Sequence, residues 1–143
     1  MKKLKSIIFL PLVLIVLSSC SLRMSDNGDL DGNWQLTAVD TVATGGVRQM
    51  KESGTFWAFQ FDMLQLRNGI NIIDMRFNHD GDALIVNDPY IDDRPTGDQK
   101  LEDVEQLRPF GINALEEHFY VRCLDSEQMI LESEKLILYF RRF

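Results

Sequence analysis

The sequence is poor in the side chains that most often carry out catalysis or bind metal ions. Its 143 residues include two histidines and two cysteines, and neither G-x-S-x-G nor H-E-x-x-H occurs. His118 and Cys123 lie at opposite parity in one strand-like segment, so the two side chains should face opposite sides. We therefore expect no enzymatic activity, no metal ion and no cofactor.

Positive charge is scarce as well. Fifteen Lys and Arg residues stand against 22 Asp and Glu residues, which gives a formal net charge of −7. Such an acidic chain does not suit the phosphate backbone of nucleic acid, so we exclude nucleic acid as a partner. The apolar run at residues 7–17 is broken by Pro11, and it is too short to span a bilayer core of about 30 Å.

The first twenty residues nevertheless have the organisation of an export signal. Three lysines in residues 1–5 precede the apolar run, and Leu17-Ser18-Ser19-Cys20 follows it. This ending resembles the lipobox of bacterial lipoproteins, in which an apolar residue and two small residues precede a modified cysteine. The resemblance implies cleavage of residues 1–19, lipid attachment to Cys20, and stable membrane anchoring by several acyl chains. The alternative is an ordinary signal peptide followed by an unmodified cysteine.

The remaining chain is the size of one domain. Removal of residues 1–19 leaves 124 residues and takes away three lysines, so the formal net charge changes from −7 to −10. Residues 20–31 are rich in Ser, Asp, Asn and Gly and are expected to form a polar tether, with the folded domain at residues 32–143. Ser21, which follows Cys20, is not acidic. In this it resembles the residue after the lipidated cysteine in lipoproteins that leave the inner membrane, and the resemblance implies an outer-membrane location.

The domain is patterned for antiparallel strands. Asn68-Gly69 and Asp80-Gly81 lie between strand-like segments and predict two-residue hairpin turns. These turns should place Leu64 opposite Ile73 on a common apolar face, provided that a β-bulge at Asp62-Met63 corrects the alternation. The side chains expected on the inner face of these three strands are Trp57, Phe59, Phe61, Leu64, Ile73, Met75, Phe77, Leu84 and Val86.

The C-terminal part repeats the pattern after a different middle segment. A loop at residues 125–127 and a turn at Ser133-Glu134 predict two further hairpins. Leu101, Val104 and Leu107 recur at helical spacing and predict a short helix that ends at Pro109. We expect this helix, or a partner protein, to cover apolar side chains on the outside of the sheet, which are Ile72, Ile85, Ile130 and Ile137.

The loop before this helix is acidic, which raises the question of calcium binding. It contains Asp88, Asp92, Asp93 and Asp98. Their spacing lacks the ligand pattern and glycine of an EF-hand loop, so a solvated loop is expected.

Seven or eight antiparallel strands with short connections predict an up-and-down β-barrel with one short helix. Gly32-Asn33-Trp34 resembles the G-x-W opening of lipocalins, and Arg142 matches the arginine near the chain end that packs on this tryptophan. The sequence is similar to the small lipocalin-like domains of Gram-negative lipoproteins. The resemblance implies that Trp34 and Arg142 close the barrel base and that a small apolar molecule binds in the barrel.

The space inside the barrel decides between two functions. An eight-strand barrel encloses either its own side chains or one small ligand, and this bulky interior favours a filled or nearly filled barrel. A pocket, if present, should open away from Trp34, with ligand contacts from Trp57, Phe59, Phe119 and Met129. The first function is binding of a small hydrophobic molecule. The alternative is a structural or accessory role through contact with another envelope protein or a second copy.

Overall fold

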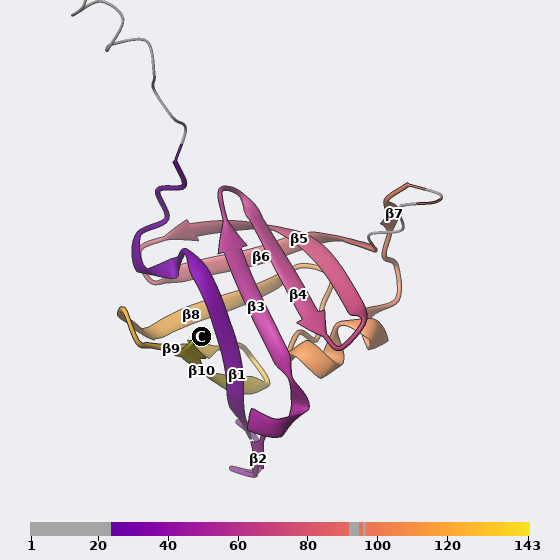
Figure 1. Cartoon of the computed structure of the whole chain (residues 1–143). Helices are drawn as coiled ribbons and strands as arrows, with labels where there is room; N and C mark the ends of the chain where they lie inside the picture. The colour runs from indigo at the N-terminus through magenta and orange to yellow at the C-terminus, as the bar shows by residue number, and fades with distance from the viewer. Residues whose placement is uncertain (1–23, 92–94, 96) are drawn as a thin grey trace, which may run out of the picture.

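Eight antiparallel strands close into a barrel in the computed structural model, which describes residues 24–91, 95 and 97–143 (Figure 1). Each strand pairs with the next along the chain, and β10 pairs with β1 to close the ring. The predicted all-β, up-and-down barrel is therefore confirmed. The barrel strands are β1 (Gly32–Thr41), β3 (Thr55–Gln60), β4 (Met63–Asn68), β5 (Asn71–Asp80), β6 (Ala83–Ile91), β8 (Glu117–Leu124), β9 (Gln128–Glu132) and β10 (Leu136–Arg142).

Short elements are added to this barrel. The strand β2 (Val47–Gln49) pairs with β1, and β7 (Gln99–Lys100) pairs with the end of β6. The helical turns are all of the 3-10 type within the described residues. They are η1 (Gly28–Leu30), η2 (Lys51–Ser53), η3 (Val104–Gln106) and η4 (Arg108–Phe110).

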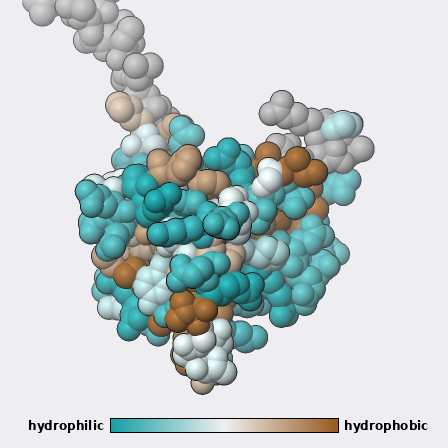
Figure 2. All heavy atoms as spheres, turned by 60° about the horizontal axis from the view of Figure 1, so that its bottom comes forward, coloured by the Kyte–Doolittle hydropathy of each residue, from teal (hydrophilic) through white to brown (hydrophobic). Residues whose placement is uncertain are grey.

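The inner face follows the predicted alternation closely. Seven of the nine expected side chains are buried, Phe77 is partly buried against the same core, and Phe61 is exposed. Outward positions are polar over most of the molecule, and Figure 2 shows hydrophobic surface confined to separate small patches on the face it displays. The buried inward members are Trp57, Phe59, Leu64, Ile73, Met75, Leu84 and Val86.

The two glycine-containing turns sit one residue later than predicted. Asn68 pairs with Asn71, so the turn residues are Gly69 and Ile70, and Leu66 rather than Leu64 lies opposite Ile73. A glycine with φ of +60° at the first central position suits a type II′ turn. The shift changes each cross-strand partner by two residues, and a shift of two leaves every side chain on the same face.

The second turn is displaced in the same way, because Asp80 pairs with Ala83 and Phe77 lies opposite Val86. At the C-terminal hairpin, Glu132 pairs with Ile137 instead of Lys135, and it approaches Arg122 at 3.4 Å. In the β8–β9 hairpin, Val121 lies opposite Leu131, and both side chains are buried.

The predicted β-bulge at Asp62-Met63 is wrong. Gln60 pairs directly with Met63, so Phe61 and Asp62 form a two-residue turn that divides the segment into β3 and β4. Phe61 adopts φ of +56°, a left-handed conformation that costs a non-glycine residue about 1 kcal/mol. A turn without glycine carries no strong sequence signal, which is why the alternation alone suggested a bulge.

The predicted short helix is present as the two turns η3 and η4, and its place differs from the expectation. Leu107 and Phe110 belong to the barrel core, so the segment closes one end of the barrel instead of lying over the outer isoleucines. Pro109 lies within η4 instead of ending the helix. The outer isoleucines remain half-buried: Ile72, Ile85, Ile130 and Ile137.

The expected tether is partly built into the fold. Leu30 is buried in the core, and Ser25 and Asn27 are hydrogen-bonded to the domain. The predicted signal peptide at residues 1–19, the predicted lipid attachment site Cys20, and the loop residues Asp92 and Asp93 lie outside the described residues. In the part of the chain that is described, no helix is both long and apolar enough to cross a membrane.

Candidate functional site

One end of the barrel, here called the base, is closed by Trp34 and Arg142. Trp34 is fully buried and donates its indole hydrogen to the carbonyl oxygen of Leu30 at 2.9 Å. Arg142 lies opposite Trp34 in the β1–β10 register, and its guanidinium carbon is 4.0 Å from the centre of the indole ring. The pair predicted from the lipocalin resemblance therefore lies in contact, as a cation–π interaction.

The arginine also binds three backbone carbonyl groups, which the sequence did not indicate. Its guanidinium donates to the carbonyl oxygens of Asp29, Asp31 and Ser126. Gly32 permits this approach, because a Cβ atom there would collide with Nη1 of Arg142. Gly32 also has φ of +119°, which side chains rarely tolerate. These contacts give the base a structural role.

The four predicted ligand contacts lie together in the interior and pack on one another and on neighbouring rings. Trp57, Phe59, Phe119 and Met129 are all buried. The ring of Trp57 is 5.8 Å from Phe119 and 6.2 Å from Phe59, centre to centre. These edge-on and tilted arrangements are the favourable ones for aromatic rings. The interior around them is therefore occupied by protein side chains.

The opposite end, here called the mouth, is closed by η3 and η4. Trp57 donates its indole hydrogen to the carbonyl oxygen of Phe110 at 3.1 Å, which fixes η4 to the interior. Gly111 follows with φ of +85°, and a Cβ atom there would lie 2.6 Å from Leu138. The segment thus acts as a plug that reaches past the rim and packs tightly against the inner wall.

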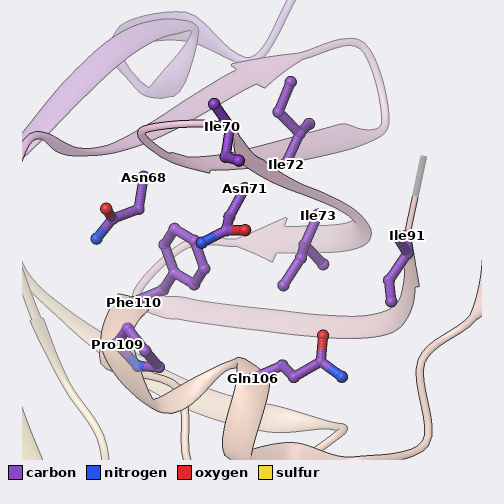
Figure 3. Close-up of a pocket in the computed structure, with 9 residues that line it drawn as sticks. All are labelled: Asn68, Ile70, Asn71, Ile72, Ile73, Ile91, Gln106, Pro109 and Phe110. Carbon is purple, nitrogen blue, oxygen red and sulfur yellow. The ribbon is translucent and has the colours of Figure 1, made fainter. Parts of the chain in front are cut away.

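A cleft of about 500 Å³ remains between this plug and the β4–β5 hairpin. Figure 3 shows Ile73 and Ile91 on the strand side of the cleft and Gln106 on the plug side. Its volume lies within the range of small-molecule sites. We call this site the mouth cleft. Its lining residues are Asn68, Ile70, Asn71, Ile72, Ile73, Ile91, Gln106, Pro109 and Phe110.

The chemistry of the mouth cleft is that of apolar walls with a few neutral polar groups. Ile73 and Phe110 are buried at its inner side, whereas Ile70 is 96% exposed at the turn. The amides of Asn68, Asn71 and Gln106 supply hydrogen-bond donors and acceptors, and none of the lining residues carries a formal charge. This composition suits a small apolar ligand with a neutral polar group. The mouth cleft was not found from the sequence, because the plug comes from a distant segment.

The residues considered for other chemistry are separated. His79 contacts the carbonyl oxygen of Gly81, and His118 contacts Glu116 at 3.4 Å. Cys123 is a free, half-buried thiol. Among the described residues, which include Asp88 and Asp98, no group of three or more His, Cys, Asp or Glu side chains is placed to hold a metal ion.

A closed antiparallel eight-strand barrel with a tryptophan–arginine base defines a lipocalin-like protein. The sequence matches the lipocalin-like domain family over residues 15–143, so the chain belongs to this family, as the resemblance predicted. No curated protein sequence matches the chain.

Two solved structures are similar to this barrel. A lipocalin-like protein from Bacteroides uniformis has a TM-score of 0.63 and 22% sequence identity, covering 81% of this chain and 100% of that chain. An uncharacterized protein from Bacteroides eggerthii has a TM-score of 0.58 and 18% identity, covering 80% of this chain and 99% of that chain. At these identities the likeness shows the fold alone.

Proposed function

We propose that the chain is an exported lipoprotein, anchored at the outer membrane through Cys20, that binds a small hydrophobic molecule in the mouth cleft. The family supports small-molecule binding, and the lipobox-like segment before Cys20 supports the anchor. The function is binding without chemistry, since the cleft is lined by isoleucines, a proline, a phenylalanine and neutral amides.

The observation that carries the proposal is the contrast between the interior and the mouth. The interior is occupied by the rings around Trp57, whereas about 500 Å³ is accessible beside Ile73, Ile91 and Phe110. The predicted contacts Trp57, Phe59, Phe119 and Met129 belong to the core beneath the site, and Trp57 is joined to the plug by its hydrogen bond to the carbonyl oxygen of Phe110. A ligand gains affinity by covering isoleucine side chains that are otherwise in contact with water.

The test is titration of residues 24–143, which contain all eight barrel strands, with N-phenyl-1-naphthylamine. This neutral apolar probe fluoresces when it leaves water. We expect saturable binding that Ile72→Gln weakens about tenfold, the equivalent of about 1.4 kcal/mol, because a polar group then lines the cleft.

The matched control is Ile130→Gln. Ile130 is also half-buried on the outside of a barrel strand, but it does not line the mouth cleft. We expect this variant to bind the probe within about twofold of the parent, because its loss of apolar surface lies elsewhere. Equal weakening by both substitutions, or no binding by the parent, would refute the mouth cleft as the site.

A second candidate is an accessory role through protein contact. The observation in its favour is that Ile130 and Ile137 stay half-buried on neighbouring strands of the outer wall. Native mass spectrometry of the same chain tests this role directly. A mass twice that of the monomer, lost in Ile130→Gln, would favour a dimer through this wall over a ligand carrier.

A further inference from the structure

The turn between β3 and β4 contains an exposed aromatic residue in a conformation that aromatic residues avoid. Phe61 has φ of +56° and is 47% exposed. The turns after β4 and β5 place Gly69 and Gly81 at the equivalent first position. Phenylalanine here costs folding free energy and leaves apolar surface in water, and strain of this kind is often retained where a residue has a function.

Two further apolar side chains lie at the same corner. Met24 is 80% exposed and lines a surface hollow with Phe61, and Met63 begins β4 directly after the turn with 41% exposure. We call Met24, Phe61 and Met63 the apolar corner. In Figure 2 a patch of hydrophobic surface borders the base of the N-terminal segment.

The N-terminal segment is fixed to this corner by hydrogen bonds. The backbone N–H of Phe61 donates to the hydroxyl oxygen of Ser25 at 2.8 Å, and the Asn27 side-chain amide donates to the Phe61 carbonyl oxygen at 2.7 Å. Asp31 accepts hydrogen bonds from Ser25 and Asn27, which connects the corner to the barrel base. The chain that leads back to Cys20 therefore departs from a defined place on the domain.

The length of this chain limits the distance between the corner and the lipid. Ser25 lies five positions after Cys20 in the sequence, and five residue steps span at most about 18 Å when fully extended. A lipid on Cys20, the anchor proposed above, would therefore hold the apolar corner within that distance of the bilayer surface.

We infer that the apolar corner inserts into the bilayer that holds the Cys20 lipid, an inference that rests on the proposed lipid anchor. Aromatic and methionine side chains gain free energy at the boundary between headgroups and acyl chains. The charged neighbours Asp26 and Asp62 exclude attraction to anionic lipid as the cause, and Asp62 is paired with Arg76 at 2.7 Å. The surface recognised is therefore zwitterionic phospholipid, contacted through apolar side chains.

This contact orients the domain. The strand β4 runs from Met63 at the apolar corner to Asn68 at the mouth cleft. Six residues of strand span about 20 Å. With the corner in the bilayer, the mouth cleft points away from the membrane towards solvent, as the view in Figure 1 illustrates for the two ends of β4.

The experiment uses full-length lipidated protein in vesicles of phosphatidylcholine with brominated acyl chains, which quench tryptophan fluorescence on contact. The native Trp34 and Trp57 are fully buried, so a new surface tryptophan reports its own surroundings. Phe61→Trp places the reporter at the apolar corner. Ile70→Trp is the matched control, because Ile70 occupies the two-residue turn at the other end of β4.

We expect brominated lipid to reduce the added emission of Phe61→Trp about twofold relative to unbrominated lipid, because the ring enters the acyl boundary. Ile70→Trp should be unchanged. Met63→Trp provides a second reporter on ordinary strand backbone and should behave like Phe61→Trp, even if tryptophan disturbs the turn.

Vesicle flotation separates the two possible failures. If the protein floats with vesicles but Phe61→Trp and Met63→Trp are quenched no more than Ile70→Trp, the insertion is refuted and the anchor stands. If the wild type fails to float, the lipid anchor is refuted and the insertion that rests on it falls as well. If Cys20→Ala floats as well as the wild type, the lipid anchor alone is refuted, and quenching of Phe61→Trp in the Cys20→Ala protein then decides whether the apolar corner enters the bilayer.

Discussion

At the scale of single residues, Arg142 joins the last strand to the segment that precedes the first. Its guanidinium covers Trp34 and donates to the carbonyl groups of Asp29, Asp31 and Ser126. A planar group with five donors can make these contacts together, whereas a lysine ammonium cannot. The sequence allowed the tryptophan–arginine pair to be predicted by resemblance, but the carbonyl groups have no sequence signature.

Substitution of Arg142 should therefore destabilise the fold. We expect Arg142→Ala to lower the free energy of unfolding by about 2–3 kcal/mol, since it removes a cation–π contact and several charge-assisted hydrogen bonds. Urea denaturation followed by circular dichroism measures the change. The control Arg122→Ala removes one exposed ion pair with Glu132 and should cost under about 1 kcal/mol. Equal losses in the two variants would contradict the role of Arg142.

Asp31 gives the base a dependence on pH. Burial raises the pKa of Asp31, but hydrogen bonds from Ser25 and Asn27 and the nearby charge of Arg142 lower it more, so the pKa lies below its usual 3.8. A carboxyl group whose pKa is lowered by folding stabilises the fold above its usual pKa, and this stability is lost as the pH falls through the folded-state value.

The stability of an Asp31→Asn variant should therefore depend less on pH than that of the parent in the acid range. At pH 7 we expect Asp31→Asn to be less stable than the parent by about 1 kcal/mol. As the pH falls below 3.8, the difference between the two proteins should shrink, because the parent carboxylate becomes protonated. Melting temperatures measured from pH 7 to pH 2.5 would show this. A difference that stays constant over this range would show that ionisation of the Asp31 carboxyl group does not stabilise the fold.

At the scale of elements, the hairpins show what the alternation of apolar and polar residues along a strand can predict and what it cannot. The faces of Leu64, Ile73 and Leu84 were predicted correctly, because burial fixes parity. Their cross-strand partners were displaced by two residues, because parity cannot distinguish turns whose registers differ by two. The turn at Phe61-Asp62 was missed, since it lacks the glycine or asparagine that marks a hairpin.

The plug was predicted to be helical, but its position at the end of the barrel was not predicted. The spacing of Leu101, Val104 and Leu107 indicates that one side of the helical segment is apolar. Whether that side faces the outer wall or the barrel interior depends on contacts such as Trp57 with Phe110, which join residues 53 positions apart. Local sequence patterns contain no information about such a contact.

The plug should control access to the interior. We expect Phe110→Ala to lower the free energy of unfolding by about 3 kcal/mol, because it leaves a cavity beneath the mouth cleft. Acrylamide should then quench Trp57, which is fully buried in the parent. Leu115→Ala, at a partly exposed site in the same connection, should change neither property. If Trp57 stays protected in folded Phe110→Ala, the plug does not seal the barrel.

At the scale of the whole molecule, the barrel is closed at both ends, and a cleft remains at one of them. Trp34 and Arg142 close the base, and Leu107 and Phe110 close the mouth. The barrel class could be predicted because eight alternating strands and short turns leave few other arrangements. The mouth cleft could not, since it lies between the β4–β5 hairpin and a plug from a distant part of the chain.

Ligand binding in the mouth cleft is best examined by native mass spectrometry of the full-length protein, purified from its own cells in mild detergent. We expect a reproducible additional mass that belongs to a small apolar molecule and is lost on denaturation. Gln106→Trp, which fills the mouth cleft from the exposed plug side, should lack this mass and remain folded. An unliganded mass for the wild type, or the same bound mass in Gln106→Trp, would contradict the claim that the mouth cleft binds the molecule.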